Sequence, residues 1–86
     1  MMKKLISVFA AIDNENEMDT FFHEIFTESE INDLNLRWRL MERLHQGDSQ
    51  RKIASELGVS LCKITRGAKI IKNDQSISIK VLKQFD

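Results

Sequence analysis

A short stretch between Ser49 and Lys72 carries the side chains whose types and spacing point to chemistry. Its only acid is Glu56, and its six basic residues are Arg51, Lys52, Lys63, Arg66, Lys69 and Lys72. Lysine and arginine bind phosphate oxygens, and arginine also pairs with the base edge of guanine. Such a local excess of positive charge is typical of a surface that faces nucleic acid, although an ordinary solvated surface is also charged.

The spacing of small and apolar residues in this stretch predicts a helix-turn-helix. Ala54 is a small residue where two helices would cross, Gly58 supplies the turn, Val59 packs beneath it and Ile64 anchors the second helix. Ser60 would cap that second helix, and its inward positions would be Leu61, Ile64, Ala68 and Ile71. The positions left outside are Cys62, Lys63, Thr65, Arg66 and Lys69. Two amphipathic helices joined by a glycine turn also occur in bundles that bind no nucleic acid, so the basic residues carry much of this prediction.

The elements that must position these residues are all helical. There is no proline, only three glycines, and the apolar residues recur at helical spacing. We expect helices near 3–12, 17–26, 27–46, 49–60 and 61–72, and a last one after Asp74, with a Thr27–Glu30 capping box and Gly47 ending the third. The chain reads as one domain, 1–86, with a helical core (1–46), a reading head (49–72) and a C-terminal helix (74–86). The first helices are apolar on several faces, which indicates contact with a second subunit.

Several other classes of protein and site are disfavoured. The whole chain is neutral, with 13 basic and 13 acidic residues, and Cys62 is its single cysteine, which fits a reducing, cytoplasmic setting. The apolar run after Lys4 is too short to span a membrane and lacks a cleavage site. No catalytic constellation is evident, so we expect no enzyme. We expect no metal site, because His23 and His45 lack a second ligand at helical spacing, and Trp38 reads as a core residue.

Several residues together carry a resemblance to a known family. Gln50-Arg51, the run Ile64-Thr65-Arg66-Gly67, and Thr27 with Arg37 upstream all stand where the Trp repressor family carries the same residues. The resemblance covers the chain from about Leu5 to Lys72. Arg37-Trp38 also resembles a Trp-repressor-like branch in which a response to tryptophan cannot be assumed.

The resemblance implies a six-helix fold, an intertwined homodimer and binding to double-stranded operator DNA. Its two reading heads would enter successive major grooves about 34 Å apart. Arg51 would pair with guanine, while Gln50, Thr65 and Lys72 would contact phosphates. The DNA-binding set would be Gln50, Arg51, Cys62, Lys63, Thr65, Arg66, Lys69 and Lys72.

The resemblance also implies L-tryptophan as corepressor. Its indole would lie between Arg37 and Arg66, Thr27 and Arg66 would hold the carboxylate, and Gly67 would give room. This sequence departs from the family at two positions: Ile70 replaces a serine that bonds the ligand's ammonium group, and Lys63 replaces a threonine. A lost hydrogen bond to a charged group corresponds to about ten- to a hundredfold in affinity.

Each of these ligand residues has a simpler interpretation, in which Thr27 is only a helix cap, Arg37 only pairs with Asp33, and Arg66 only binds phosphate. From the resemblance as a whole, we expect a sequence-specific, DNA-binding transcriptional repressor with tryptophan as corepressor. The alternatives are a regulator of the same fold that does not respond to tryptophan, or a helical interaction module.

Overall fold

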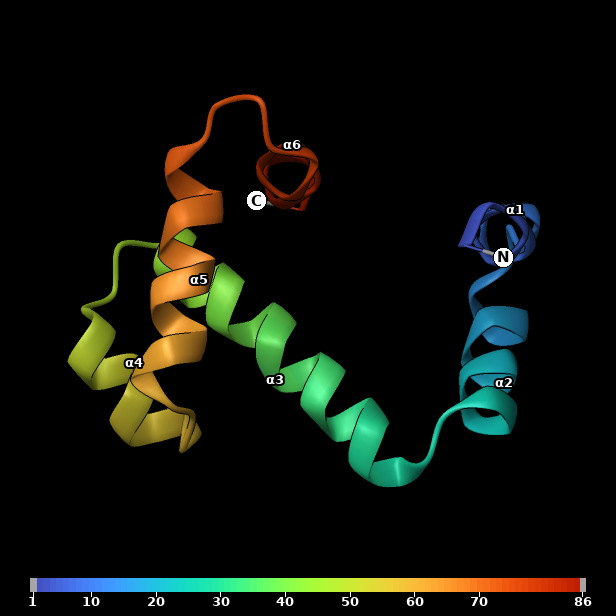
Figure 1. The fold of residues 1–86 in the computed structure, drawn as a ribbon, viewed down its shortest axis with the longest axis horizontal. Helices are drawn as coiled ribbons and strands as arrows, with labels where there is room; N and C mark the ends of the chain where they lie inside the picture. The colour runs from blue at the N-terminus through green and yellow to red at the C-terminus, as the bar shows by residue number, and fades with distance from the viewer. Residues whose placement is uncertain (1, 86) are drawn as a thin grey trace. The chain divides into compact units, whose positions relative to one another are not determined.

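The computed structural model describes residues 2–85 and folds into six helices, which confirms the all-α prediction (Figure 1). The helices are α1 (Met2–Ala11), α2 (Glu15–Ile25), α3 (Glu28–His45), α4 (Gln50–Leu57), α5 (Leu61–Lys72) and α6 (Ile77–Gln84). The chain forms two compact units that divide between Asn32 and Asp33, within α3. Each unit is described by itself below. Among the helices of residues 2–85, none is both long and apolar enough to cross a membrane.

Polar side chains fix where most of these helices begin. The hydroxyls of Ser49, Ser60 and Ser76 accept hydrogen bonds from backbone N–H groups at the starts of α4, α5 and α6. The predicted capping box before α3 is confirmed, because the Thr27 N–H donates to Glu30 Oε1 at 2.8 Å and the Glu30 N–H donates to Thr27 Oγ1 at 3.1 Å. Each cap pairs an N–H group that has no carbonyl partner inside its helix.

Glycine ends two of the helices in the second unit. Gly58 follows α4 with φ of 65°, in the left-handed region, and its N–H donates to the Ala54 carbonyl. Gly47 follows α3 with φ of 93°. Side chains with a Cβ rarely adopt this backbone, so the two glycines predicted as helix stops have the conformation that a stop requires.

The first unit is built on phenylalanine. Phe9 of α1 packs edge-on against Phe21 of α2, with ring centroids 5.4 Å apart, and Phe22 and Phe26 lie close together at 5.1 Å. Neither α1 nor α2 contains a buried residue. Leu5 and Ile6, about one turn before Phe9 in α1, are 47% and 58% exposed, so much of the apolar surface of this helix is open.

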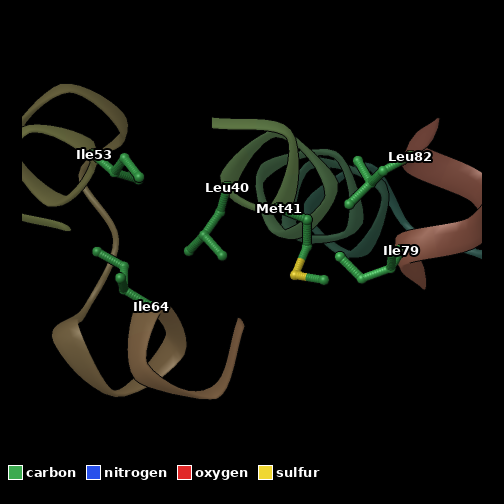
Figure 2. Close-up of a cluster of buried hydrophobic side chains, with 6 residues drawn as sticks. All are labelled: Leu40, Met41, Ile53, Ile64, Ile79 and Leu82. Atoms are coloured by element: carbon green, nitrogen blue, oxygen red, sulfur yellow. The ribbon is translucent and has the colours of Figure 1, made fainter. Parts of the chain in front are cut away.

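The second unit has a core to which four helices contribute. Its buried residues are Leu40 and Met41 from α3, Ile53 from α4, Ile64 from α5, and Ile79 and Leu82 from α6 (Figure 2). Ile53 and Ile64 are fully buried and fix α4 against α5. Burying one such side chain contributes about 1.5–3 kcal/mol. The predicted anchor at Ile64 is therefore confirmed.

Two predicted core residues are more exposed than expected. Leu61, predicted to face inward, is 60% exposed, because it is the first residue of α5 and the buried face of that helix begins one turn later at Ile64. Trp38, predicted as core, is 37% exposed. It lines two hollows at once, so its ring stays partly open.

Candidate nucleic-acid interface and ligand pocket

The predicted DNA-facing residues are carried by α4 and α5, which are joined by the turn at residues 58–60. Gln50 and Arg51 begin α4, and the others lie along α5. Every one of them is exposed: Gln50, Arg51, Cys62, Lys63, Thr65, Arg66, Lys69 and Lys72. The buried pair Ile53 and Ile64 lies beneath them and holds the two helices in a fixed arrangement.

The only acid of this region is neutralised from α3. Arg43 is just 7% exposed, and its Nη2 lies 2.7 Å from the Oε1 of Glu56. Its Nε also donates to the carboxylate of Asp48 in the turn before α4. Because Glu56 is paired in this way, the six cations of residues 49–72 face solvent with no free carboxylate among them. Sequence reasoning missed Arg43, although Asp48 follows it closely across a glycine turn.

The same ion pairs set the protonation of their members. The hydrogen bond from Arg43 holds the pKa of the Asp48 carboxyl below its ordinary value, and the nearby charges of Lys52 and Arg39 act in the same direction. The hydrogen bonds to Asp48 and Glu56 raise the pKa of Arg43. Both groups are therefore charged at neutral pH, and they connect the end of α3 to α4 through charge-assisted hydrogen bonds.

Thr65 has its hydroxyl proton in use within α5. Its Oγ1 donates to the Leu61 carbonyl at 2.9 Å. A phosphate contact needs a donor, so the hydroxyl would have to rotate away from the helix to make one. The neighbouring Cys62 is a free, exposed thiol.

A pocket of about 480 Å³ lies between α3, α5 and α6 within the second unit. It brings together Arg37, Arg66, Gly67 and Ile70, which are four of the five predicted ligand residues. Its full lining is Leu34, Arg37, Trp38, Leu40, Met41, Lys63, Arg66, Gly67, Ile70 and Ser78. Pockets of this size, with apolar walls and a few polar groups, are typical of small-molecule sites. Thr27, the fifth predicted residue, belongs to the first unit.

Three cations line this pocket. Arg37, Lys63 and Arg66 take part in no ion pair with any residue of the range 2–85, and no acid belongs to the lining. The simpler interpretation of Arg37, that it pairs with Asp33, is therefore wrong for the described chain. The pocket offers positive charge to an anion, and the flat guanidinium groups fit a carboxylate.

Gly67 serves the packing of two helices. A Cβ built on it would lie 2.6 Å from Leu40 Cδ2, 3.1 Å from Leu44 Cδ1 and 3.2 Å from Met41 Sδ. The missing side chain therefore lets α3 and α5 pack closely. Gly67 also lines the pocket described above, and the expectation that it gives a ligand room stays a prediction.

Ser78 is a pocket residue that sequence reasoning missed. It comes from α6, beyond the part of the chain on which the resemblance rests, and its spacing from α5 gave no signal. Its hydroxyl has no hydrogen-bond partner among residues 2–85. In the same described range, no three His, Cys, Asp or Glu side chains gather to hold a metal ion.

Comparison with known proteins gives one consistent result. The family model described as Trp repressor protein matches residues 1–86. Three relatives described as Trp operon repressor homolog, from Xylella fastidiosa strains M23, Temecula1 and 9a5c, are each 45% identical over 65 residues, which covers 74% of this chain and 71% of each relative. No solved structure gives a significant match.

Proposed function

Because the chain belongs to the Trp repressor family of transcriptional regulators, we propose that it binds operator DNA through α4 and α5 and uses L-tryptophan, held in the pocket beside α5, as its corepressor. One observation carries this proposal. Arg66 is exposed on the cationic side of α5 and also lines the pocket. A ligand that fixes Arg66 therefore acts on the helix that would read DNA.

The charge of the α4–α5 surface supports DNA binding. Its cations are exposed, and its single acid is already paired with Arg43. In a plot of the logarithm of DNA affinity against the logarithm of salt concentration, each phosphate neutralised by a basic side chain makes the slope more negative by about 0.9. Up to six contacts per chain are available from these lysines and arginines.

The chemistry of the pocket supports a ligand with an aromatic ring and a carboxylate. Arg37 and Arg66 provide guanidinium groups that stack on an aromatic face and pair with a carboxylate. Thr27 is proposed, from the family resemblance, to help hold the carboxylate. Its Oγ1 accepts from the Glu30 N–H, which leaves its own proton free to donate.

We also propose a homodimer. Neither α1 nor α2 buries a residue within the single chain, and the apolar side of α1 that carries Leu5 and Ile6 is exposed. Apolar helices of this kind need a partner to cover them. A monomeric mass at micromolar concentration would contradict the dimer.

Gel shifts on the DNA upstream of its own gene, with and without L-tryptophan over a salt series, test the proposal. We expect specific binding that tryptophan strengthens. Arg66→Ala should lose both DNA affinity and the tryptophan response. The matched control is Lys69→Ala, an exposed cation of the same helix outside the pocket lining, which should lose DNA affinity and keep the response.

The outcomes separate the candidate functions. If DNA binds equally well with and without tryptophan, the corepressor is wrong and a tryptophan-independent regulator remains, as Ile70 would favour. If the protein does not bind DNA even at low salt, the DNA proposal fails and a helical interaction module replaces it, because non-specific phosphate binding should appear under those conditions.

A further inference from the structure

We infer that Arg43 is a positioning residue for DNA recognition, because its guanidinium group fixes the angle at which α4 presents Arg51 to a base pair. This inference rests on the proposed function, since it concerns the α4–α5 surface that is proposed to bind DNA. Arg43 lies in α3 and is buried, so it would act through α4 and not by touching DNA. Its partners lie in the turn before α4 and in α4 itself.

The two carboxylates that hold Arg43 flank α4. Asp48, which accepts from the Arg43 Nε, stands two residues before the first residue of α4, and Glu56, 2.7 Å from the Arg43 Nη2, stands next to its last residue. The backbone joins α3 to the same turn, because the Asp48 N–H donates to the Arg43 carbonyl at 3.1 Å. Among residues 2–85, no buried side-chain nitrogen or oxygen lacks a hydrogen-bond partner. One guanidinium group is thus tied to α4 near both of its ends.

Apolar packing alone would leave α4 free to tilt. Of its eight residues only Ile53 is buried, while Ala54 and Leu57 are partly buried against the core. Apolar contacts have no preferred direction, so a helix held mainly near its middle can tilt about that point. Hydrogen bonds between charged groups are directional, and a guanidinium group presents its N–H groups in a rigid, planar fork. Arg43 therefore sets the tilt of α4, and Ile53 sets its depth.

The tilt of α4 matters more for reading bases than for binding phosphates. Arg51 is exposed in the first turn of α4, three residues after Asp48. A bidentate contact with guanine needs two N–H groups at the correct distance and angle at once, so it depends on where the helix points. A lysine on a phosphate is a flexible point charge without that requirement. Loss of the Arg43 contacts should therefore reduce discrimination between DNA sequences more than general DNA affinity.

Glu56 allows a test that separates charge from hydrogen bonding. Glu56→Gln removes the charge and keeps an oxygen that accepts from Arg43, whereas Glu56→Ala removes both. The Glu56 side chain is 50% exposed and alanine is favoured in helices, so both variants should fold. Fluorescence anisotropy with L-tryptophan present would compare two affinities of the full chain. One is for a duplex that the parent protein selects from a random library, and the other is for the unselected library.

The ratio of these two affinities is the readout. We expect Glu56→Ala to reduce it about fivefold, the lower end of the range for a lost bidentate base contact, because Asp48 still holds Arg43. Glu56→Gln should leave the ratio unchanged, and both variants should bind the unselected library more tightly at low salt, since each loses one negative charge. Arg39→Met is the matched control, because it removes a cation of α3 whose partner Glu42 lies in the same helix. Its ratio should equal that of the parent, and a variant that only lost stability would weaken both affinities together.

Hydrogen exchange of the free protein gives a second readout that needs no DNA. The amides of α4 should exchange faster in Glu56→Ala than in Glu56→Gln, because α4 is then held less firmly. If the ratio falls in the alanine variant alone and α4 exchanges faster there, the inference holds. A fall in the ratio without faster exchange of α4 would place the effect at Glu56 itself and overturn the positioning role.

The remaining results separate this inference from the proposed function. If the parent discriminates between sequences and both Glu56 variants keep its ratio, the inference is overturned and the DNA proposal stands. If the parent selects no sequence from the library, sequence-specific DNA binding is wrong, and the role of Arg43 in recognition is wrong with it. Faster exchange of α4 in Glu56→Ala would then show that Arg43 only stabilises the fold.

Discussion

Replacing Gly67 with alanine tests how closely α5 packs on α3. The new Cβ would lie 2.6 Å from Leu40 Cδ2, well inside van der Waals contact, and Leu40 is only 3% exposed, so its side chain has little free space into which to move. Overpacking of this kind costs about 1–3 kcal/mol. Alanine returns about 1 kcal/mol through its higher helix propensity. The contact is severe, so we place the strain near the top of its range and expect a net loss of about 1–2 kcal/mol.

Urea unfolding followed by far-ultraviolet circular dichroism measures this loss, at one fixed protein concentration because a dimer would make stability depend on concentration. The same substitution in a Leu40→Val background is the control, because valine has no Cδ atoms. There the cost should shrink, or the change should become stabilising. If Gly67→Ala is as stable as the parent, or if its cost is the same in both backgrounds, then Gly67 does not mark a close helix contact.

Three further predictions follow from the structure. Ile53→Ala should cost about 2–5 kcal/mol in thermal unfolding, because Ile53 is fully buried, whereas Leu61→Ala should stay within about 0.5 kcal/mol; equal losses would contradict the assigned core. Asp48→Asn should lower the melting temperature at neutral pH, because the ionised Asp48 carboxyl, whose pKa is lowered in the folded state, stabilises the fold. In a pH series, the difference in melting temperature between variant and parent should shrink below about pH 4 and vanish once the parent's carboxyl is protonated. Arg51→Ala should reduce discrimination between operator and random DNA, whereas Lys72→Ala should weaken both alike and reduce the salt slope by about 1, and fluorescence anisotropy would show whether the two variants differ.

The sequence predicted the helices well because their signals are local. The capping box at Thr27, the serine before α5 and the glycines at 47 and 58 each act within one turn of the chain, and all have the predicted roles. The anchor Ile64 was also predictable, since it repeats the inward spacing of a helix. The grouping of Arg37, Arg66 and Ile70 around one pocket came from the family resemblance, because no local spacing relates α3 to α5.

What the sequence did not predict depends on contacts between distant residues. Arg43 looks like one of several surface arginines until the fold brings Glu56 beside it. Ser78 joins the pocket only because α6 folds back on the end of α3, where Ile79 and Leu82 pack with Met41 (Figure 2). The exposure of Leu61 and Trp38 was likewise missed. Helical periodicity predicts which side of a helix is apolar, but it does not predict how far along that side a neighbouring helix covers it.

Trp38 gives the protein an optical probe of its own pocket. It is the chain's single tryptophan, and it lies in the wall of the candidate ligand site with part of its ring in solvent. Its fluorescence is therefore free of overlap from other indoles in the chain. A phenyl carboxylate, which does not absorb where indole does, would displace water from this ring and shift its emission to shorter wavelength. Binding could then be followed without a label, and the same signal would show whether DNA disturbs the pocket.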